Sequence, residues 1–205
     1  MKSKYSVIVF DLGNVLLPFD YKLIITRLES IEKGLGEKFV AFYRERYDVH
    51  RQFERGDLSE DAFVNIMLDV VQHKISGSQF CEIYSKIFSV NYQLAEVLPG
   101  LKENYKVVLM SNTNPIHENY GWKDYDFLKY FDKLILSHEV RAVKPEEAIY
   151  RAVEKFTGAP PEEHFYTDDI PDYIEGARRL GWDASQFVGN EALFREFQVR
   201  GIVYR

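Results

Sequence analysis

Two patterns of hydrophobic residues divide the chain. Short runs of consecutive apolar residues are typical of strands buried on both faces of a sheet. One run lies near the start of the chain, and the others follow the Pro99-Gly100 pair. We predict strands at 7–10, 106–110, 133–136, 165–167 and 184–188.

Apolar residues at helical spacing occupy most of the remaining chain. Between about residues 20 and 90 this pattern occurs without any strand-like run. Ser59 is a suitable N-cap for one of these helices. We predict helices at 22–33, 38–48, 59–74 and 78–88, and, between or after the later strands, at 117–131, 145–156, 171–180 and from Asn190 onward.

The order of these elements predicts the fold class. Strands that alternate with helices form parallel sheets with right-handed crossovers. We therefore predict an α/β fold, in which a parallel sheet is flanked by helices and an all-α helical bundle is inserted after the first strand. The α/β core comprises residues 1–17 and 95–205, and the helical insert comprises residues 18–94.

Composition narrows the class of protein. Of the 205 residues, 46% are hydrophobic and 28% are charged, as in ordinary globular proteins. The net charge of −6 argues against nucleic-acid binding, and no apolar run approaches the ~20 residues of a membrane span. The N-terminal residues lack the features of a signal peptide, and the single cysteine, Cys81, favours a reducing compartment. We expect a cytoplasmic protein without membrane or nucleic-acid partners; the sequence indicates no oligomeric state.

Polar residues follow the ends of several predicted strands. In parallel α/β sheets, ligands bind outside the carboxyl ends of the strands, so these side chains are expected to meet at one edge. A lysine also precedes the helix that starts at Pro145. The resulting candidate site residues are Asp11, Ser111, Asn112, Lys144, Asp168 and Asp169.

This set of side chains indicates a particular chemistry. Three carboxylates around one point repel each other unless a cation lies among them, and hard oxygen ligands suit Mg²⁺. Lys144 and the Ser111 hydroxyl would hold an anion beside it. Asp11 would then attack phosphorus, and water would hydrolyse the aspartyl-phosphate. Taken singly, Asp11, Ser111, Asn112 and the aspartate pair are also compatible with helix capping, and Lys144 with a surface position.

Four motifs in order, F-D-L-G-N-V-L, L-M-S-N-T, V-K-P and T-D-D-I-P-D-Y-I-E-G-A, resemble the haloacid dehalogenase superfamily. The residues of these motifs are most similar to those of the bacterial alpha-D-glucose-1-phosphate phosphatase branch of this superfamily. The resemblance implies a Rossmann-like core, a helical cap and a Mg²⁺-dependent phosphatase acting on a small phosphorylated metabolite, such as a sugar phosphate. It also implies Asp11 as nucleophile, Ser111, Asn112 and Lys144 as phosphate ligands, and Asp11, Asp168 and Asp169 as metal ligands.

Gly13 departs from the D-x-D form of the first motif in most phosphatases of this superfamily. Its carbonyl can still bind the metal, but it cannot exchange the proton that the second aspartate exchanges, a loss of about 10²–10⁴ in rate. Two alternatives are open: Asp20 or Glu54 substitutes from the cap side, or an acidic leaving group needs little help. The protein could instead bind phosphorylated metabolites with low turnover. A 2-haloacid dehalogenase is a further alternative, against which the aspartate pair argues.

One segment of the predicted cap is a candidate for substrate contact. Residues 53–55 precede Gly56, where a loop could face the active site. Arg55 is therefore a candidate substrate-binding residue, although a surface position would explain it equally well.

Overall fold

The computed structural model describes residues 4–204. Its centre is a parallel five-stranded sheet with strand order β3-β2-β1-β4-β5. Phe10, the last residue of β1, is in register with Leu109 of β2 and Thr167 of β4. The central strands therefore end together at one edge of the sheet. The strands are β1 (Val7–Phe10), β2 (Lys106–Ser111), β3 (Lys133–Leu136), β4 (His164–Asp168) and β5 (Asp183–Gln186).

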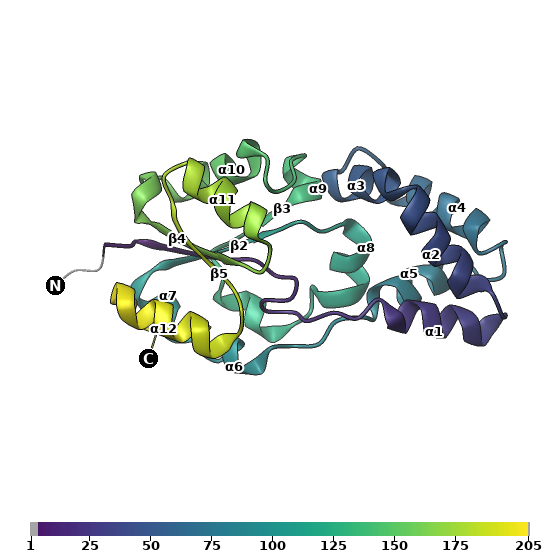
Figure 1. Cartoon of the computed structure of the whole chain (residues 1–205), viewed down its shortest axis with the longest axis horizontal. Coiled ribbons are helices and arrows are strands. Elements are labelled where there is room, and N and C mark those ends of the chain that lie inside the picture. The colour runs from purple at the N-terminus through teal and green to yellow at the C-terminus, as the bar shows by residue number, and fades with distance from the viewer. Residues whose placement is uncertain (1–3, 205) are drawn as a thin grey trace.

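Helices cover both faces of the sheet (Figure 1). Alternate residues of β1 enter two different hydrophobic cores, because side chains of a strand point to opposite faces. Val7 and Val9 pack in the core formed with α10 and α11, whereas Ile8 and Phe10 pack in the core formed with α7 and α12. These helices are α7 (Leu98–Asn104), α10 (Glu147–Thr157), α11 (Pro171–Arg179) and α12 (Asn190–Arg200).

A separate helical lobe lies beyond the carboxyl edge of the sheet (Figure 1). It has its own hydrophobic core, in which the rings of Phe53 and Phe63 stack with centroids 4.2 Å apart. The two chain segments that join it to the α/β part meet at an antiparallel bridge between Phe19 and Phe88. The lobe consists of α1 (Lys22–Ile31), α2 (Leu35–Glu45), α3 (Tyr47–Arg55), α4 (Glu60–Val70) and α5 (Gly77–Ser85).

The predicted fold class is confirmed, but two predicted helices differ from the structure. The helix expected at 38–48 is divided at Arg46, whose backbone leaves the helical region, and a further helix, α3, follows it. The helix expected at 117–131 is broken into shorter elements. In this segment Gly121 packs closely against Phe88. The short elements of the chain are α6 (Tyr92–Ala95), α8 (Pro115–His117), η1 (Glu118–Trp122), η2 (Asp126–Tyr130), α9 (Ser137–Val140) and η3 (Pro161–Glu163).

No helix within residues 4–204 is long and apolar enough to cross a membrane. The longest of them have 11 residues, well short of the ~20 that a span needs.

Candidate active site

A buried lysine joins two aspartates at the carboxyl edge of the sheet. Asp11 directly follows β1, Asp168 ends β4, and Lys144 lies between α9 and α10. The Lys144 Nζ atom is 2.6 Å from Asp11 Oδ1 and 2.6 Å from Asp168 Oδ2, and all three residues are buried. The structure thus brings three of the predicted site residues into direct contact.

Asp168 and Asn112 hold this lysine in place. Asp168 accepts hydrogen bonds from the Tyr166 hydroxyl and, over 2.8 Å, from the Ile170 backbone N–H. Asn112 Oδ1 accepts a 2.8 Å hydrogen bond from the Lys144 backbone N–H, and its Nδ2 donates to the Lys144 carbonyl over 3.3 Å. Because its hydrogen bonds fix the Asp168 carboxylate, Asp168 orients the Lys144 side chain. Asp168 itself does not border the cavity that adjoins this cluster.

Burial and mutual charge change the acidity of the cluster. Burial raises the pKa of Asp11 to about 7; Lys144 opposes this rise and Asp168 adds to it. Burial would lower the pKa of Lys144, but Asp11 and Asp168 outweigh it, and the pKa is raised. Burial and the charge of Asp168 also raise the pKa of Asp169, although Asn14 Nδ2 donates to its Oδ2 over 3.2 Å. The site therefore has an excess of buried negative charge.

A divalent cation fits this excess. Asp11, Asp168 and Asp169 each offer an oxygen, and these atoms all lie within 4.8 Å of one another. When all three carboxylates are ionised, they and the one ammonium have a net charge of −2, which an ion such as Mg²⁺ would neutralise. Carboxylate oxygens are hard ligands that Mg²⁺ prefers. Asp11, Asp169 and Gly13 border the cavity, so they are the residues best placed to hold the ion.

The cavity has a volume of about 220 Å³ and lies between the sheet edge and the helical lobe. Its two sides come from different parts of the chain. The sheet-edge side, here called the core wall, comprises Asp11, Gly13, Asn14, Asn112, Lys144, Asp169, Ile170 and Tyr173. The opposite side, here called the cap wall, comprises Phe19, Tyr21, Tyr47, His50, Arg51 and Glu54.

A carboxylate in the cap wall is held between two basic side chains. Glu54 Oε1 is 3.2 Å from His50 Nε2, and its Oε2 is 3.1 Å from an Arg51 guanidinium nitrogen. Burial opposes the charge of Glu54, but His50 and Arg51 outweigh burial and lower its pKa. Arg51 also donates to the Lys144 carbonyl over 3.5 Å, so the two walls of the cavity are in contact.

Besides Asp168, three residues considered from the sequence do not border the cavity. Ser111 is buried, and its hydroxyl donates a 3.4 Å hydrogen bond to the Asn112 carbonyl. Arg55 forms ion pairs with Glu146 and, over 3.3 Å, with Asp57. The third residue, Asp20, accepts from the Lys22 backbone N–H over 2.8 Å at the start of α1. The predicted roles of Ser111 and Arg55 in binding therefore have no contact in the cavity to support them.

The sequence interpretation missed His50 and Arg51 as site residues. Both lie on α3, which the sequence interpretation did not predict as a separate helix. The signal that was present is the spacing of Val49 and Phe53, which are both buried in the core of the helical lobe. That spacing indicates a helix through this segment, although it does not show which polar residues face the cavity.

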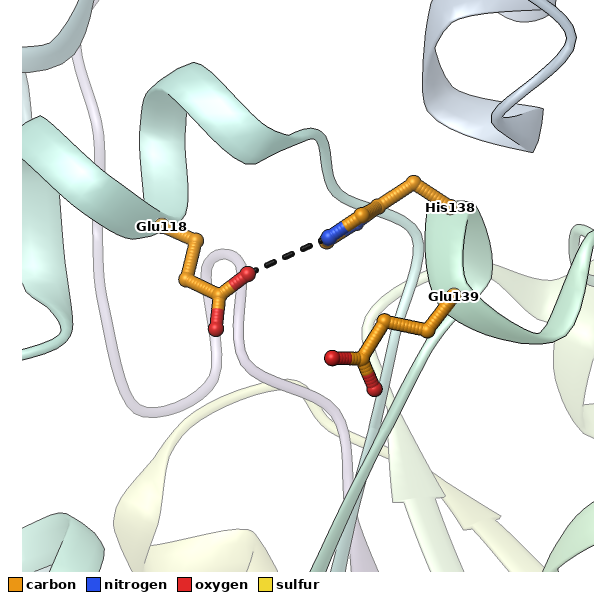
Figure 2. A group of neighbouring side chains, drawn as sticks. All are labelled: Glu118, His138 and Glu139. Atoms are coloured by element: carbon orange, nitrogen blue, oxygen red, sulfur yellow. Dashed lines mark ion pairs between the residues drawn. The ribbon is translucent and has the colours of Figure 1, made fainter.

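A second group of acidic and histidine side chains lies outside the cavity. Figure 2 shows Glu118 pointing toward His138, whose Nε2 is 3.1 Å from the Glu118 carboxylate. Glu139 is nearby but exposed. The backbone of the same helix, α9, packs tightly against Gly56. A Cβ added at Gly56 would lie only 2.3 Å from the His138 carbonyl oxygen. The ion pair thus helps to fix the short helix against which the end of α3 rests.

The chain thus combines a parallel α/β sheet, a buried carboxylate cluster at the carboxyl edge of that sheet, and a helical lobe beyond this edge. The chain belongs to the haloacid dehalogenase-like hydrolases, a family that matches residues 5–181. It is 25% identical over 187 residues to a D-ribitol-5-phosphate phosphatase of Bacteroides thetaiotaomicron, covering 87% of this chain and 90% of that protein. Superfamily membership, predicted from the four motifs, is confirmed.

Solved structures agree with this assignment. A haloacid dehalogenase family enzyme of the same organism, in complex with magnesium and inorganic phosphate, is 29% identical and has a TM-score of 0.79, covering 93% of this chain and all of that one. An L-2-haloacid dehalogenase of Xanthobacter autotrophicus is 18% identical, with a TM-score of 0.63 over 98% of this chain and 89% of that one. This second likeness shows the fold alone. The predicted cofactor agrees with the magnesium in the first structure.

Proposed function

We propose that the protein is a Mg²⁺-dependent phosphatase that hydrolyses a small phosphorylated sugar or polyol through an aspartyl-phosphate. The observation that carries this proposal is the pairing of Asp11 with Lys144 at the floor of a cavity, in a carboxylate cluster with a net charge of −2. A carboxylate so placed serves as a nucleophile when a cation offsets the charge of the phosphoryl group.

The contacts of Asp11 assign its two oxygens different tasks. Lys144 holds Oδ1, which leaves Oδ2 to attack phosphorus. The leaving alcohol departs, and water then hydrolyses the aspartyl-phosphate to regenerate Asp11. A bound Mg²⁺ ion would supply positive charge for the phosphoryl oxygens, held by Asp11, Asp169 and the Gly13 carbonyl. Lys144 and Asn112 border the same space as further phosphate ligands, and Ser111 joins them if its hydroxyl turns away from the Asn112 carbonyl.

The size of the cavity supports a small substrate. At about 220 Å³ it is smaller than the ~300–1,000 Å³ of typical sites for drug-sized ligands. The named activity of the D-ribitol-5-phosphate phosphatase supports a polyol phosphate as substrate. The residues of the four motifs support a sugar phosphate, such as glucose 1-phosphate. The lone cysteine, buried and unpaired, is consistent with the cytoplasm.

Gly13 lies close to an aromatic ring of the cap wall. A Cβ at this position would lie 3.1 Å from the ring of Phe19. Because glycine has no side chain to exchange a proton, the proton that the leaving oxygen needs must come from elsewhere, and a more acidic leaving group, such as that of a sugar 1-phosphate, needs it least. A 2-haloacid substrate is disfavoured because dehalogenation uses no metal, so the substrate carboxylate would meet carboxylates that no cation neutralises.

Phosphate release from a panel of substrates tests the proposal. The panel contains sugar phosphates, polyol phosphates, p-nitrophenyl phosphate and a 2-chloroacid, each with Mg²⁺ and with a strong chelator. We expect Mg²⁺-dependent phosphate release from p-nitrophenyl phosphate and at least one sugar or polyol phosphate. Chloride release that survives the chelator would support a dehalogenase, and tight binding of phosphates without release would support a low-turnover binding protein.

A further inference from the structure

The leaving group of a bound phosphate must face the cap wall. In phosphoryl transfer the attacking and leaving oxygens lie roughly in line on opposite sides of phosphorus. Asp11, the proposed attacking residue, and α3 line the same cavity from different parts of the chain. We therefore expect the leaving oxygen and the carbon chain behind it to extend toward α3. The charged residues that this helix brings to the cavity are His50, Arg51 and Glu54.

Glu54 and Arg51 present hydrogen-bonding groups of both kinds to this space. Glu54 uses one oxygen for His50 and the other for Arg51, and a carboxylate has about four acceptor positions. Arg51 donates to Glu54 and to the Lys144 carbonyl, out of about five N–H donors. Each group therefore has capacity for a hydroxyl, which both donates and accepts.

Glu54 is held in position from two directions. On its side-chain side, His50 is oriented by the Tyr43 and Tyr84 hydroxyls, 3.2 and 3.3 Å from its Nδ1. On its backbone side, the Glu54 carbonyl accepts a 2.6 Å hydrogen bond from Ser137 Oγ, which also accepts from the Thr113 N–H over 2.9 Å. The carboxylate is thus fixed relative to the core wall, as a residue that discriminates between substrates must be.

The charge of this pair decides which leaving groups it suits. Glu54 and Arg51 together are neutral, and the side chain of Glu54 is only 13% exposed. A second carboxylate or phosphate on the substrate would have to compete with Glu54 for Arg51 and would lie beside an ionised carboxylate with little water to screen it. A neutral hydroxylated chain meets neither obstacle.

We propose that Glu54 and Arg51 determine substrate specificity by binding the hydroxyl groups of an uncharged leaving group, so that the enzyme selects neutral polyol or sugar monophosphates and rejects phosphates with a second anionic group. This inference rests on the proposed phosphatase function and names its substrate class.

A matched pair of substrates tests the charge requirement. Glycerol 3-phosphate and 3-phosphoglycerate are of similar size and differ in carrying a neutral hydroxymethyl or a carboxylate, and p-nitrophenyl phosphate reports the chemistry without hydroxyl recognition. We expect kcat/KM of the wild-type enzyme with Mg²⁺ to be at least about tenfold higher for glycerol 3-phosphate than for 3-phosphoglycerate. Equal values, or a preference for the acid, would overturn the inference.

The variant Glu54→Gln tests the residue itself. It keeps the shape but removes the charge, so kcat/KM for glycerol 3-phosphate should fall about 10- to 100-fold, mainly through KM. The loss should be smaller for p-nitrophenyl phosphate, which has no hydroxyl group for Glu54 to bind, and the preference for the neutral substrate should shrink. Glu82→Gln on α5, an exposed residue paired with Lys86, is the matched control and should change none of these values.

The remaining outcomes separate the two proposals. An equal loss for p-nitrophenyl phosphate and glycerol 3-phosphate in a folded Glu54→Gln enzyme would place Glu54 in the chemical step and overturn the specificity role. If this variant does not fold, as thermal unfolding would show, the wild-type comparison of the two matched substrates still decides. Failure of the wild-type enzyme to release phosphate from p-nitrophenyl phosphate with Mg²⁺ would instead refute the proposed phosphatase function.

Discussion

The two walls of the cavity are built in different ways. The core wall takes its charged residues from segments far apart in the chain, which the parallel sheet brings to one edge. The cap wall takes its charged residues from a single helix, α3, within a lobe that has its own hydrophobic core. Because the walls fold around separate cores, reaction chemistry and substrate selection can change independently, and substitutions in the two walls should affect different kinetic parameters.

The largest expected effect comes from Asp11, the proposed nucleophile in the core wall. Asp11→Asn keeps the shape of the side chain and leaves Lys144 paired with Asp168. Phosphate release should fall by at least about 10⁴-fold, because an amide does not form the covalent intermediate. Steady-state assays on p-nitrophenyl phosphate with saturating Mg²⁺ measure this loss. Activity within tenfold of wild type in a folded variant would refute the assignment of Asp11.

The next effect concerns the cation. A strong chelator should abolish phosphate release, and added Mg²⁺ should restore it. Asp169→Asn removes a negative charge from the candidate metal ligands and should raise the Mg²⁺ concentration for half-maximal activity by at least about tenfold. Asp172→Asn, at an exposed position on α11, is the matched control. An unchanged Mg²⁺ requirement in Asp169→Asn would exclude Asp169 as a ligand.

The core wall could be predicted from the sequence because the sheet leaves little freedom. Asp11 follows a strand buried on both faces, and Asp168 ends another, so parallel pairing alone places both at one edge. Lys144 precedes a helix that packs on the same sheet. What the sequence did not show is the division of labour: Asp168 is fully buried and holds Lys144, whereas Asp169 borders the cavity. That difference depends on the backbone turn after β4.

The cap wall could not be predicted in the same way. Arg51 and Arg55 are one helical turn apart on α3, a displacement of about 5–6 Å along its axis. Because of that displacement, Arg51 borders the cavity, whereas Arg55 lies outside it and pairs with Glu146. Where a helix sits along its axis is set by packing between the lobes, such as the contact of Gly56 with His138, and no local pattern encodes that contact.

The two arginines allow this distinction to be tested. Arg51→Gln should lower kcat/KM for the preferred sugar or polyol phosphate about tenfold, mainly through KM, because it removes a charged donor from the cavity. Arg55→Gln should change kcat/KM by less than about threefold, because its partly exposed ion pairs contribute little. A larger effect of Arg55→Gln than of Arg51→Gln would mean that α3 sits differently over the core in solution.

The smallest expected effect concerns a residue at the junction of the two walls. His117 of α8 stacks on Tyr84 of α5, with ring centroids 4.4 Å apart, and its Nδ1 accepts from Asn114 Nδ2 over 3.1 Å. Within the described residues its Nε2 has no hydrogen-bond partner. Burial lowers the pKa of His117 to about 3, with a further contribution from His50. An uncharged histidine therefore lies where the cap meets the core.

This histidine should make stability depend on pH in a defined direction. Between pH 6.5, its usual pKa, and about pH 3, the unfolded chain binds a proton at His117 and the folded chain does not, so the free energy of unfolding falls as pH falls. From pH 7 to pH 5 this residue should account for a loss of about 2 kcal/mol. His117→Phe keeps an aromatic ring against Tyr84 but cannot bind a proton. Urea unfolding at the two pH values should therefore show that the free energy of unfolding of this variant falls by about 2 kcal/mol less than that of the wild type. An equal loss in both proteins would mean that His117 is already protonated at pH 5, and that water reaches the junction between the two walls.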